Sequence, residues 1–292
     1  MKKRPAIQEA MKREIRQRCG FGCVICGIPL YEYEHMLKWS VVKRHVASEI
    51  TLLCRFHHGQ RTSGLLPIEI VREANLAPYN LNAGASSAVM LHFTGRKVDL
   101  KLGGNSFNLT DINEGEKFCP LIIDRVPVVS FVHRKGRNYL SLNIYDDEQK
   151  LILKVVENEI VIDTGQWDVE WVGKVLTIRQ GPKRVFLKIE FRPPGDVVIE
   201  KGTILYNGIE LIIGKNYLYC SNIEGLWQRC SATNSHYGLS LGVPPLSGVS
   251  CWSVEGVNRE NLDRAEARKA LRKKLSASRW TLKNNGVLAG VV

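Results

Sequence analysis

The pattern of hydrophobic and polar positions changes near residue 88 of this chain and again after residue 222. Between residues 88 and 222 the pattern alternates with a period of two, which is typical of strands with one buried face. The clearest β-branched runs, bounded by Gly, Pro or Asn, lie at 150–162, 175–179, 184–191 and 196–200. Short turns between these runs favour antiparallel pairing. Because no fixed repeat period is found, the pattern leaves a sandwich, a barrel and a solenoid-like stack open.

The two ends of the chain predict helices instead. Residues 7–18 are helix-forming and are followed by a Cys-Gly-Phe-Gly segment that ends a helix. Residues 65–87 predict a short helix and then a linker. A third, basic helix is predicted over 258–276, with Asn258 as a candidate cap and a narrow apolar stripe. Its basic faces fit a solvated surface of a docked helix and a phosphate-contacting helix equally well.

The distribution of charge indicates what kind of partner these ends favour. Of 292 residues, 41 are Lys or Arg and 29 are Asp or Glu, a formal balance of +12, while 44% are hydrophobic. This composition excludes wholesale disorder. Residues 1–64 carry 12 basic and 5 acidic side chains, residues 65–254 carry 20 of each, and residues 255–292 carry 9 and 4. The basic excess at both ends indicates a polyanionic partner, either nucleic acid or an anionic membrane surface.

The sequence predicts a cytoplasmic protein without a membrane partner. The basic start, Met1 to Pro5, is followed by polar residues where a signal peptide needs an apolar region, and no run of about 18 apolar residues occurs. The stripe within 258–276 is narrow and lacks Trp and Phe, which argues against a membrane-surface helix. The cysteines are not spaced as a disulfide framework, so we expect free or metal-bound thiols in a reducing compartment.

Two residue pairs near the N-terminus have the spacing of a zinc site. Cys23 and Cys26 are separated by two residues, and Cys54 and His57 follow with the same spacing. Two such pairs within about 40 residues can converge tetrahedrally on Zn²⁺. The spacing therefore predicts a structural zinc, and a closed site with four protein ligands has no open position for catalysis.

Further polar residues cluster between and after the zinc pairs. Glu34 and His35 lie between them, and His58 directly follows the ligand His57. A carboxylate beside a histidine, with a second histidine brought near by the zinc knuckle, supplies ligands for a divalent ion and a near-neutral base for water. A lone histidine more often has a surface or packing role. The positions relative to the zinc pairs favour a hydrolytic site.

This combination resembles the HNH endonuclease family. The residues that carry the resemblance are the two zinc pairs, Tyr33-Glu34-His35, the run 50–58 and the trailing Arg61-Thr62-x-Gly64, within roughly residues 12–66. The resemblance implies a ββα-metal fold, with a general-base histidine on the first strand and metal ligands on that strand and the helix. It covers less than a quarter of the chain.

The resemblance also implies a role for each matched position. His35 is expected to be the general base that deprotonates water. Glu34 and His58 are expected to hold a catalytic Mg²⁺ or Mn²⁺, which polarises the scissile phosphate and stabilises the leaving oxygen. The structural zinc is expected on Cys23, Cys26, Cys54 and His57.

Two positions depart from the family pattern. Glu34 stands where Asp is common, so its carboxylate must reach the metal with one more methylene. Glu49 stands near the family's middle Asn, which fixes the loop that bears the base. Either Glu49 orients His35 by accepting from its other ring nitrogen, or Glu49 is solvated and another group such as His45 or Ser48 holds the loop.

Candidate nucleic-acid contacts come from both basic ends. Arg61, where the family often has Lys, either contacts a phosphate or lies on a solvated helix face. Arg268, Arg272 and Lys273 are the candidates on the C-terminal helix. We expect double-stranded DNA as the partner, with self-association through the β-rich segment left open. The β-rich segment has no motif that assigns it a role.

We therefore expect an α+β protein with a small zinc-stabilised ββα-metal module, a larger, mostly antiparallel all-β domain and a basic C-terminal helix. The expected parts are a nuclease module (1–72), a linker (73–87), a β-rich accessory domain (88–240) and a Gly/Pro/Ser-rich linker with a basic helical tail (241–292). The expected function is metal-dependent endonuclease activity, in bacterial or phage defence or restriction by analogy with small HNH proteins. The alternative is a zinc-stabilised nucleic-acid-binding protein that does not cut.

Overall fold

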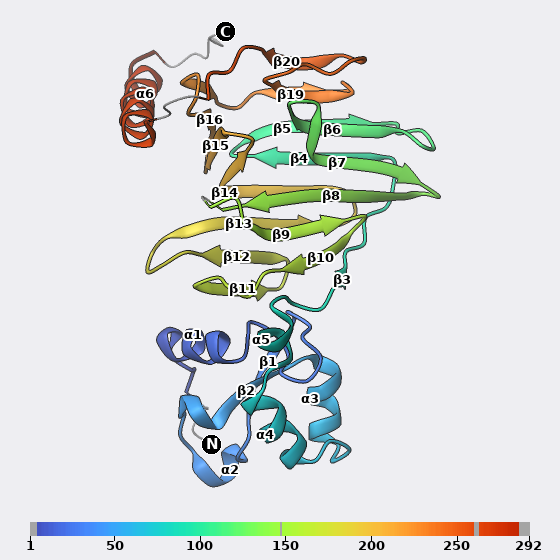
Figure 1. Ribbon diagram of the computed structural model, residues 1–292, viewed down its shortest axis with the longest axis vertical. Coiled ribbons are helices and arrows are strands. Elements are labelled where there is room, and N and C mark those ends of the chain that lie inside the picture. The colour runs from blue at the N-terminus through green and yellow to red at the C-terminus, as the bar shows by residue number, and fades with distance from the viewer. Residues whose placement is uncertain (1–4, 147, 260–262, 286–292) are drawn as a thin grey trace.

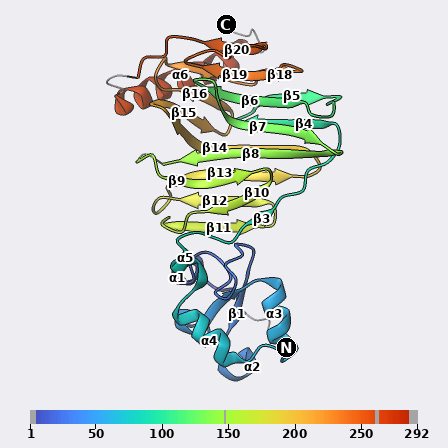
Figure 2. The ribbon, with the colours of Figure 1, turned by 45° about the vertical axis from the view of Figure 1, so that its right-hand side comes forward.

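The computed structural model describes residues 5–146, 148–259 and 263–285. It is a mixed α+β structure that consists mostly of β-sheet and carries a C-terminal helix, as the sequence predicts. Three parts follow one another along the long axis in Figures 1 and 2. A mainly helical module lies at one end, a body of stacked strands occupies the middle, and helix α6 (Arg264–Asn285) lies at the other end.

The N-terminal module is built around a two-stranded hairpin. Strand β1 (Glu32–His35) pairs antiparallel with β2 (Ile50–Leu53), and His35 lies opposite Ile50. The other elements are α1 (Glu9–Arg18), α2 (Trp39–Val42), the 3₁₀ turn η1 (Ala47–Glu49), α3 (Arg55–Thr62), α4 (Ile68–Leu76) and α5 (Tyr79–Ala83). The module has its own hydrophobic core, separate from that of the β-sheet body. Helix α1 confirms the helix predicted over 7–18.

Two sheets form the body of the molecule. The first has the strand order β20-β19-β6-β7-β8-β9-β10-β3. Its strands are β3 (Val89–Met90), β6 (Lys117–Ile123), β7 (Val126–Arg134), β8 (Arg137–Tyr145), β9 (Leu151–Val156), β10 (Glu159–Ile162), β19 (Tyr237–Leu241) and β20 (Ser250–Val254). Strand β19 is parallel to both of its neighbours, and the remaining pairs are antiparallel.

The second sheet runs from β11 to β17 in chain order and branches at β14. Its strands are β4 (Lys97–Leu102), β5 (Asn105–Thr110), β11 (Asp168–Val172), β12 (Val175–Arg179), β13 (Val185–Arg192), β14 (Asp196–Tyr206), β15 (Ile209–Gly214), β16 (Tyr217–Cys220), β17 (Gly225–Trp227) and β18 (Ser231–Thr233). The first half of β14 pairs parallel with β4, and its second half pairs antiparallel with β15.

A single hydrophobic core joins the two sheets. Residues that alternate along β8, such as Leu140 and Leu142, and along β13, such as Leu187 and Ile189, are fully buried in the same cluster. Burial of the inner face of each sheet makes the body a sandwich, one of the three architectures that the alternating pattern left open. The strands predicted at 150–162, 175–179, 184–191 and 196–200 are confirmed as β9 with β10, β12, β13 and the first half of β14.

The segment 73–87 contains the end of α4 and the whole of α5 and is hydrogen-bonded to both neighbouring parts. The Asn80 side chain, which is completely buried, donates from Nδ2 to the Gly20 carbonyl at 2.8 Å. On the other side, the Ser86 backbone N–H donates to the Ile162 carbonyl at 2.8 Å. The segment thus holds the module against the first sheet.

The C-terminal helix begins later than the sequence indicates. It begins at Arg264, and the Asp263 carboxylate accepts a hydrogen bond from the Glu266 backbone N–H at 3.0 Å, so Asp263 takes the capping role expected of Asn258. Ala267 and Leu271 of α6 pack on Tyr219 of β16. Within the ranges described above, no helix has both the length and the apolar character that crossing a membrane requires.

Candidate metal centre and the residues around it

The backbone of the module brings the four expected zinc ligands together. Cys23 and Cys26 lie in a tight turn between α1 and β1, in which the Gly27 N–H donates to the Cys23 carbonyl at 2.8 Å. This turn is joined to the hairpin by the Val24 N–H, which donates to the Leu52 carbonyl at 3.0 Å. Cys54 follows β2 directly, and His57 lies in the first turn of α3.

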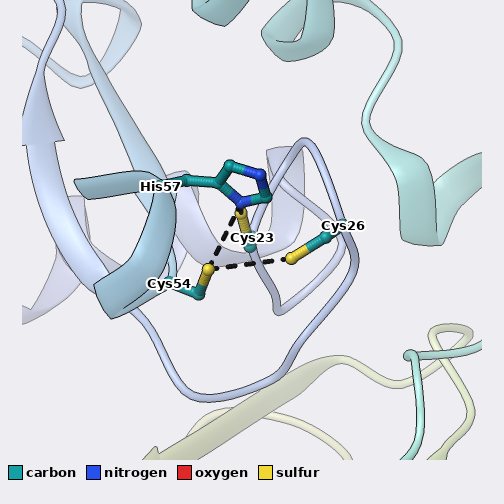
Figure 3. Close-up of side chains that lie close together, drawn as sticks. All are labelled: Cys23, Cys26, Cys54 and His57. Atoms are coloured by element: carbon teal, nitrogen blue, oxygen red, sulfur yellow. Dashed lines mark hydrogen bonds between the residues drawn. The ribbon is translucent and has the colours of Figure 1, made fainter. Parts of the chain in front are cut away.

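The ligand atoms have the spacing of a tetrahedral zinc site. Figure 3 shows the three sulfur atoms and the His57 ring facing one another, and all four ligand atoms lie within 4.8 Å of each other. His57 Nδ1 is 3.4 Å from Cys23 Sγ and 3.3 Å from Cys54 Sγ, and the Sγ atoms of Cys26 and Cys54 are 3.7 Å apart. Tetrahedral zinc with ordinary bond lengths separates its ligand atoms by about 3.5 to 3.8 Å. The group therefore fits a zinc ion in both chemistry and size.

The thiols of this group influence one another's protonation. A hydrogen bond from the Cys26 thiol lowers the pKa of Cys23 well below its usual range, while burial acts in the opposite direction. The same hydrogen bond raises the pKa of Cys26. One thiolate in the pair is thus favoured even before a metal adds its own charge, and thiolate is the form of cysteine that binds metal.

Residues of the 73–87 segment pack closely against the turn that carries Cys23 and Cys26, called the zinc turn below. Gly27 has φ +74°, and a methyl group there would overlap the Asn80 side-chain oxygen, the Tyr79 ring and the Ser87 hydroxyl. The Ser87 hydroxyl donates to the Cys26 carbonyl at 2.6 Å. Glycine is required at this position by both the backbone conformation and the close packing.

Glu34 and His58 face each other beside the zinc ligands. Glu34 Oε2 lies 3.1 Å from His58 Nε2, and their side chains are 20% and 31% exposed, so solvent reaches both. The other ring nitrogen, His58 Nδ1, lies 3.6 Å from Glu32 Oε2. Glu32 and Glu34 share one face of β1 because side chains alternate along a strand. The structure thus brings together the two residues expected to hold a catalytic ion.

His35 has a different environment. As the neighbour of Glu34 on β1, its side chain leaves the strand on the opposite face, and it is only 6% exposed. Its Nε2 lies 3.1 Å from His45 Nδ1, and the Trp39 ring lies against both imidazoles, with centroid distances of 5.5 Å to His35 and 4.8 Å to His45. The expected base is therefore held in a partly closed aromatic cluster.

Glu49, a candidate for orienting His35 along with His45 and Ser48, is hydrogen-bonded to the loop that carries His45. Its Oε1 accepts a hydrogen bond from Arg44 Nη2 at 2.9 Å. Its backbone carbonyl accepts from the Met36 N–H at 2.9 Å, directly after His35. Arg61 lies half-buried in α3, one turn beyond the histidine pair.

The remaining expected nucleic-acid contacts lie at the other end of the molecule (Figures 1 and 2). Arg268 of α6 is 3.3 Å from Glu210 Oε1, a carboxylate with no exposed surface, and Arg264 lies at the same distance from that oxygen. Arg272 and Lys273 are exposed. The helix therefore uses part of its charge to dock, and Arg272 and Lys273 face solvent.

One feature near the site had no signal in the sequence. Arg16 of α1, which is 2% exposed, contacts Tyr33 of β1 and two carboxylates of β11. The residues involved are up to 154 positions apart in the chain, and no spacing rule connects them. By contrast, the sequence does suggest His45 as one of the groups that hold the loop.

Comparison with protein-family models, with curated proteins and with solved structures found no match. The function of this chain is therefore inferred from its own residues and their geometry.

Proposed function

We propose that this protein is a metal-dependent endonuclease that hydrolyses phosphodiester bonds, with double-stranded DNA as the expected substrate and an HNH-type ββα-metal site in the N-terminal module. The observation that carries the proposal is the contact between Glu34 and His58, in which Glu34 Oε2 lies 3.1 Å from His58 Nε2. Glu34 lies on the β1–β2 hairpin and His58 on α3, and the Cys₃His group joins the hairpin to this helix. His35, the proposed base, is the neighbour of Glu34 on the same strand.

We propose that Glu34 and His58 hold a divalent ion such as Mg²⁺ or Mn²⁺. Adjacent ligands of an octahedral ion with bonds of about 2.1 Å are about 3.0 Å apart, which agrees with the 3.1 Å separation of Glu34 Oε2 and His58 Nε2. The Glu32 carboxylate near His58 Nδ1 resembles the carboxylate that commonly orients a metal-binding histidine. When bound, such an ion supplies positive charge that stabilises the phosphate and the leaving oxygen.

In the proposed reaction His35 acts on water. The imidazole takes a proton from the water molecule, the water oxygen forms a bond to phosphorus, and the bond from phosphorus to the leaving sugar oxygen breaks. The leaving oxygen takes a proton from solvent. A histidine suits this step because its ordinary pKa lies close to neutral, so a large fraction of the side chain is in the basic form.

The positive charge of the module supports a polyanionic substrate. Residues 1–64 carry 12 basic against 5 acidic side chains, and Arg61 lies on the helix that carries His58. A second basic surface on α6, with Arg272 and Lys273 exposed, lies at the far end of the molecule. We propose that the two ends contact separate stretches of one nucleic acid, because charge at each end attracts phosphate independently. A role in defence or restriction is part of this proposal by analogy only.

The decisive experiment incubates the purified full-length protein with supercoiled plasmid, with added Mg²⁺ or Mn²⁺ and without added divalent ion. We expect nicking or linearisation only with the ion, and its loss in His35→Ala with unchanged zinc content. His92→Ala, at an exposed histidine of the β-sheet body, is the control and should cut like the wild type. Cleavage by His35→Ala at the wild-type rate would show that His35 is not the base.

A second candidate function is supported by the burial of His35. The ring is 6% exposed and lies on the opposite face of β1 from Glu34, and Glu34 Oε2 and His58 Nε2 already lie within hydrogen-bonding distance of each other, at 3.1 Å. This arrangement also fits a zinc-stabilised protein that binds nucleic acid without cutting it. Salt-sensitive plasmid binding with no cleavage in any metal would favour this function and contradict the endonuclease.

A further inference from the structure

His35 is the first member of a short chain of hydrogen bonds. Its Nε2 lies 3.1 Å from His45 Nδ1, and His45 Nε2 lies 2.9 Å from the backbone carbonyl oxygen of Pro5. His45 lies between α2 and η1, ten residues after His35. The chain of contacts thus connects the proposed base to the backbone ahead of α1.

The carbonyl at the end of this chain determines where the protons lie. A carbonyl oxygen can only accept a hydrogen bond, so His45 Nε2 carries hydrogen and donates to Pro5. In a neutral His45 the other nitrogen, Nδ1, then holds a lone pair and must accept. The donor to it is His35 Nε2, so in a neutral His35 the lone pair lies on Nδ1. The geometry therefore selects one of the two tautomers of His35.

The surroundings limit rotation of both rings. Trp39 packs nearly edge-on against His35, with an interplanar angle of 77°, and at 31° against His45. His35 is 6% exposed, so few solvent molecules compete for its Nε2. A ring that packs against Trp39 and is hydrogen-bonded at Nε2 has little freedom to flip.

We infer that His45 is a positioning residue for His35: it accepts the Nε2 hydrogen of His35 and so presents Nδ1 as the basic nitrogen. The inference rests on the proposed function, in which His35 takes a proton from water. When Nδ1 gains that proton, the Nε2 hydrogen bond to His45 becomes charge-assisted and stronger. His45 thus stabilises the base more after proton transfer than before it, which is the direction that accelerates the step.

The tautomer is tested by nitrogen NMR of His35 in the full-length protein at pH 8, where neutral histidines give distinct signals for each tautomer. We expect the wild type to show the Nε2–H form. His45→Asn should keep it, because the Asn side-chain oxygen stands near the position of His45 Nδ1, whereas His45→Ala and His45→Gln should give a mixture. Three variants keep the test decisive if one of them fails to fold. A wild-type His35 in the Nδ1–H form, or an unchanged tautomer in both His45→Ala and His45→Gln, would overturn the inference.

Cleavage kinetics test the consequence for the base. We expect His45→Ala to lower kcat about 10- to 100-fold with little change in KM and in zinc content, and His45→Asn to recover most of the loss. A merely structural role would lower zinc content or raise KM, and would contradict the inference. If the wild type does not cleave, the proposed function is overturned, and with it the role of His45 in positioning a base. The NMR result still shows, independently of cleavage, whether His35 Nε2 donates a hydrogen bond to His45.

Discussion

The guanidinium of Arg16 and the carboxylate of Asp168 form a two-point ion pair across the boundary between the module and the β-sheet body. Nε donates to Oδ1 at 2.8 Å and Nη2 donates to Oδ2 at 2.9 Å, and the side chains are 2% and 1% exposed. Burial alone would lower the pKa of Arg16, but the hydrogen bonds to Asp168 raise it above its ordinary value. The pair joins α1 to the edge strand β11, so it fixes how the two parts meet.

The same network reaches the strand of the candidate site. Arg16 Nη1 donates to the Tyr33 hydroxyl at 3.0 Å, and Tyr33 directly precedes Glu34 on β1. Burial raises the pKa of Tyr33 to about 12, although Arg16 acts against the shift, so the phenol stays neutral near pH 7. On the β-sheet side, Arg179 pairs with Asp168 and Glu170 at 2.9 Å each. The β-sheet body therefore supports β1 through Arg16 of α1.

Removing the charge of Asp168 should strongly destabilise the protein. Asp168→Asn leaves Arg16 buried with a weaker partner, and breaking a buried pair from one side typically costs about 3 to 5 kcal/mol of unfolding free energy. Because Glu170 still contacts Arg16, we expect about 3 kcal/mol, measured by urea unfolding. Glu200→Gln is the matched control, since its pair with Lys188 joins two strands but is 42% and 41% exposed. It should cost less than about 1 kcal/mol. Equal losses of unfolding free energy in the two variants would show that burial of the Arg16 pair does not determine its contribution to stability.

Adding a methyl group at Gly27 should destabilise the zinc turn. Gly27→Ala places an L-residue at φ +74° and overlaps Asn80, Tyr79 and Ser87. Gly136→Ala is the control, because Gly136 has φ +71° and no atom of the described residues lies within 4 Å of the added carbon. The control isolates the backbone strain, about 1 to 2 kcal/mol, and Gly27→Ala should add about 1 to 3 kcal/mol of overpacking.

Zinc content separates the two glycine variants further. Gly27→Ala should lower the zinc bound per chain, measured by metal analysis after dialysis, because the Cys23 to Cys26 turn must shift. Gly136→Ala, in the β7–β8 hairpin, should leave zinc content unchanged. The same zinc content in both variants would argue against the close packing around the zinc turn.

The parts of the fold that sequence predicts are those set by local pattern. Strand β12 is predicted at 175–179 and observed there, because its β-branched run and the turns that bound it can be recognised from consecutive residues. The zinc ligands are found for a similar reason, since two short spacings place each pair on one turn. The proximity of Glu34 and His58 can then be predicted as well, because the zinc group fixes β1 beside α3.

The parts that sequence does not predict depend on contacts between distant residues. The parallel pairing of β14 with β4 joins Asp196 to Asp99, and the pair Arg16 and Asp168 spans 152 positions. No local pattern encodes which edge strand receives α1. The start of α6 also differs from the expected one, since the Asp263 carboxylate caps the helix. The Asn258 backbone carbonyl instead accepts a hydrogen bond from the Asn222 side chain.

Replacing a single ligand should release the zinc. Cys26→Ser exchanges a thiolate for a hydroxyl that binds Zn²⁺ poorly, so we expect bound zinc to fall from about one per chain to a small fraction. The module should then lose its near-ultraviolet circular dichroism, because zinc binding and folding are coupled in such sites. Cys230→Ser is the matched control, a half-buried free cysteine in the β-sheet body. Full zinc occupancy in Cys26→Ser would contradict the four-ligand site.

The docked and the exposed basic residues of α6 should contribute to different properties, the first to stability and the second to phosphate binding. Arg268 lies 3.3 Å from the fully buried Glu210, so Arg268→Ala should cost about 1 kcal/mol of unfolding free energy. The double variant Arg272→Ala/Lys273→Ala removes two exposed charges and should leave stability unchanged. If both side chains contact phosphate, it should reduce the slope of log affinity against log salt by about 1.8 in plasmid binding. An unchanged slope would show that these two residues of α6 make no phosphate contacts, and would confine binding to the rest of the molecule.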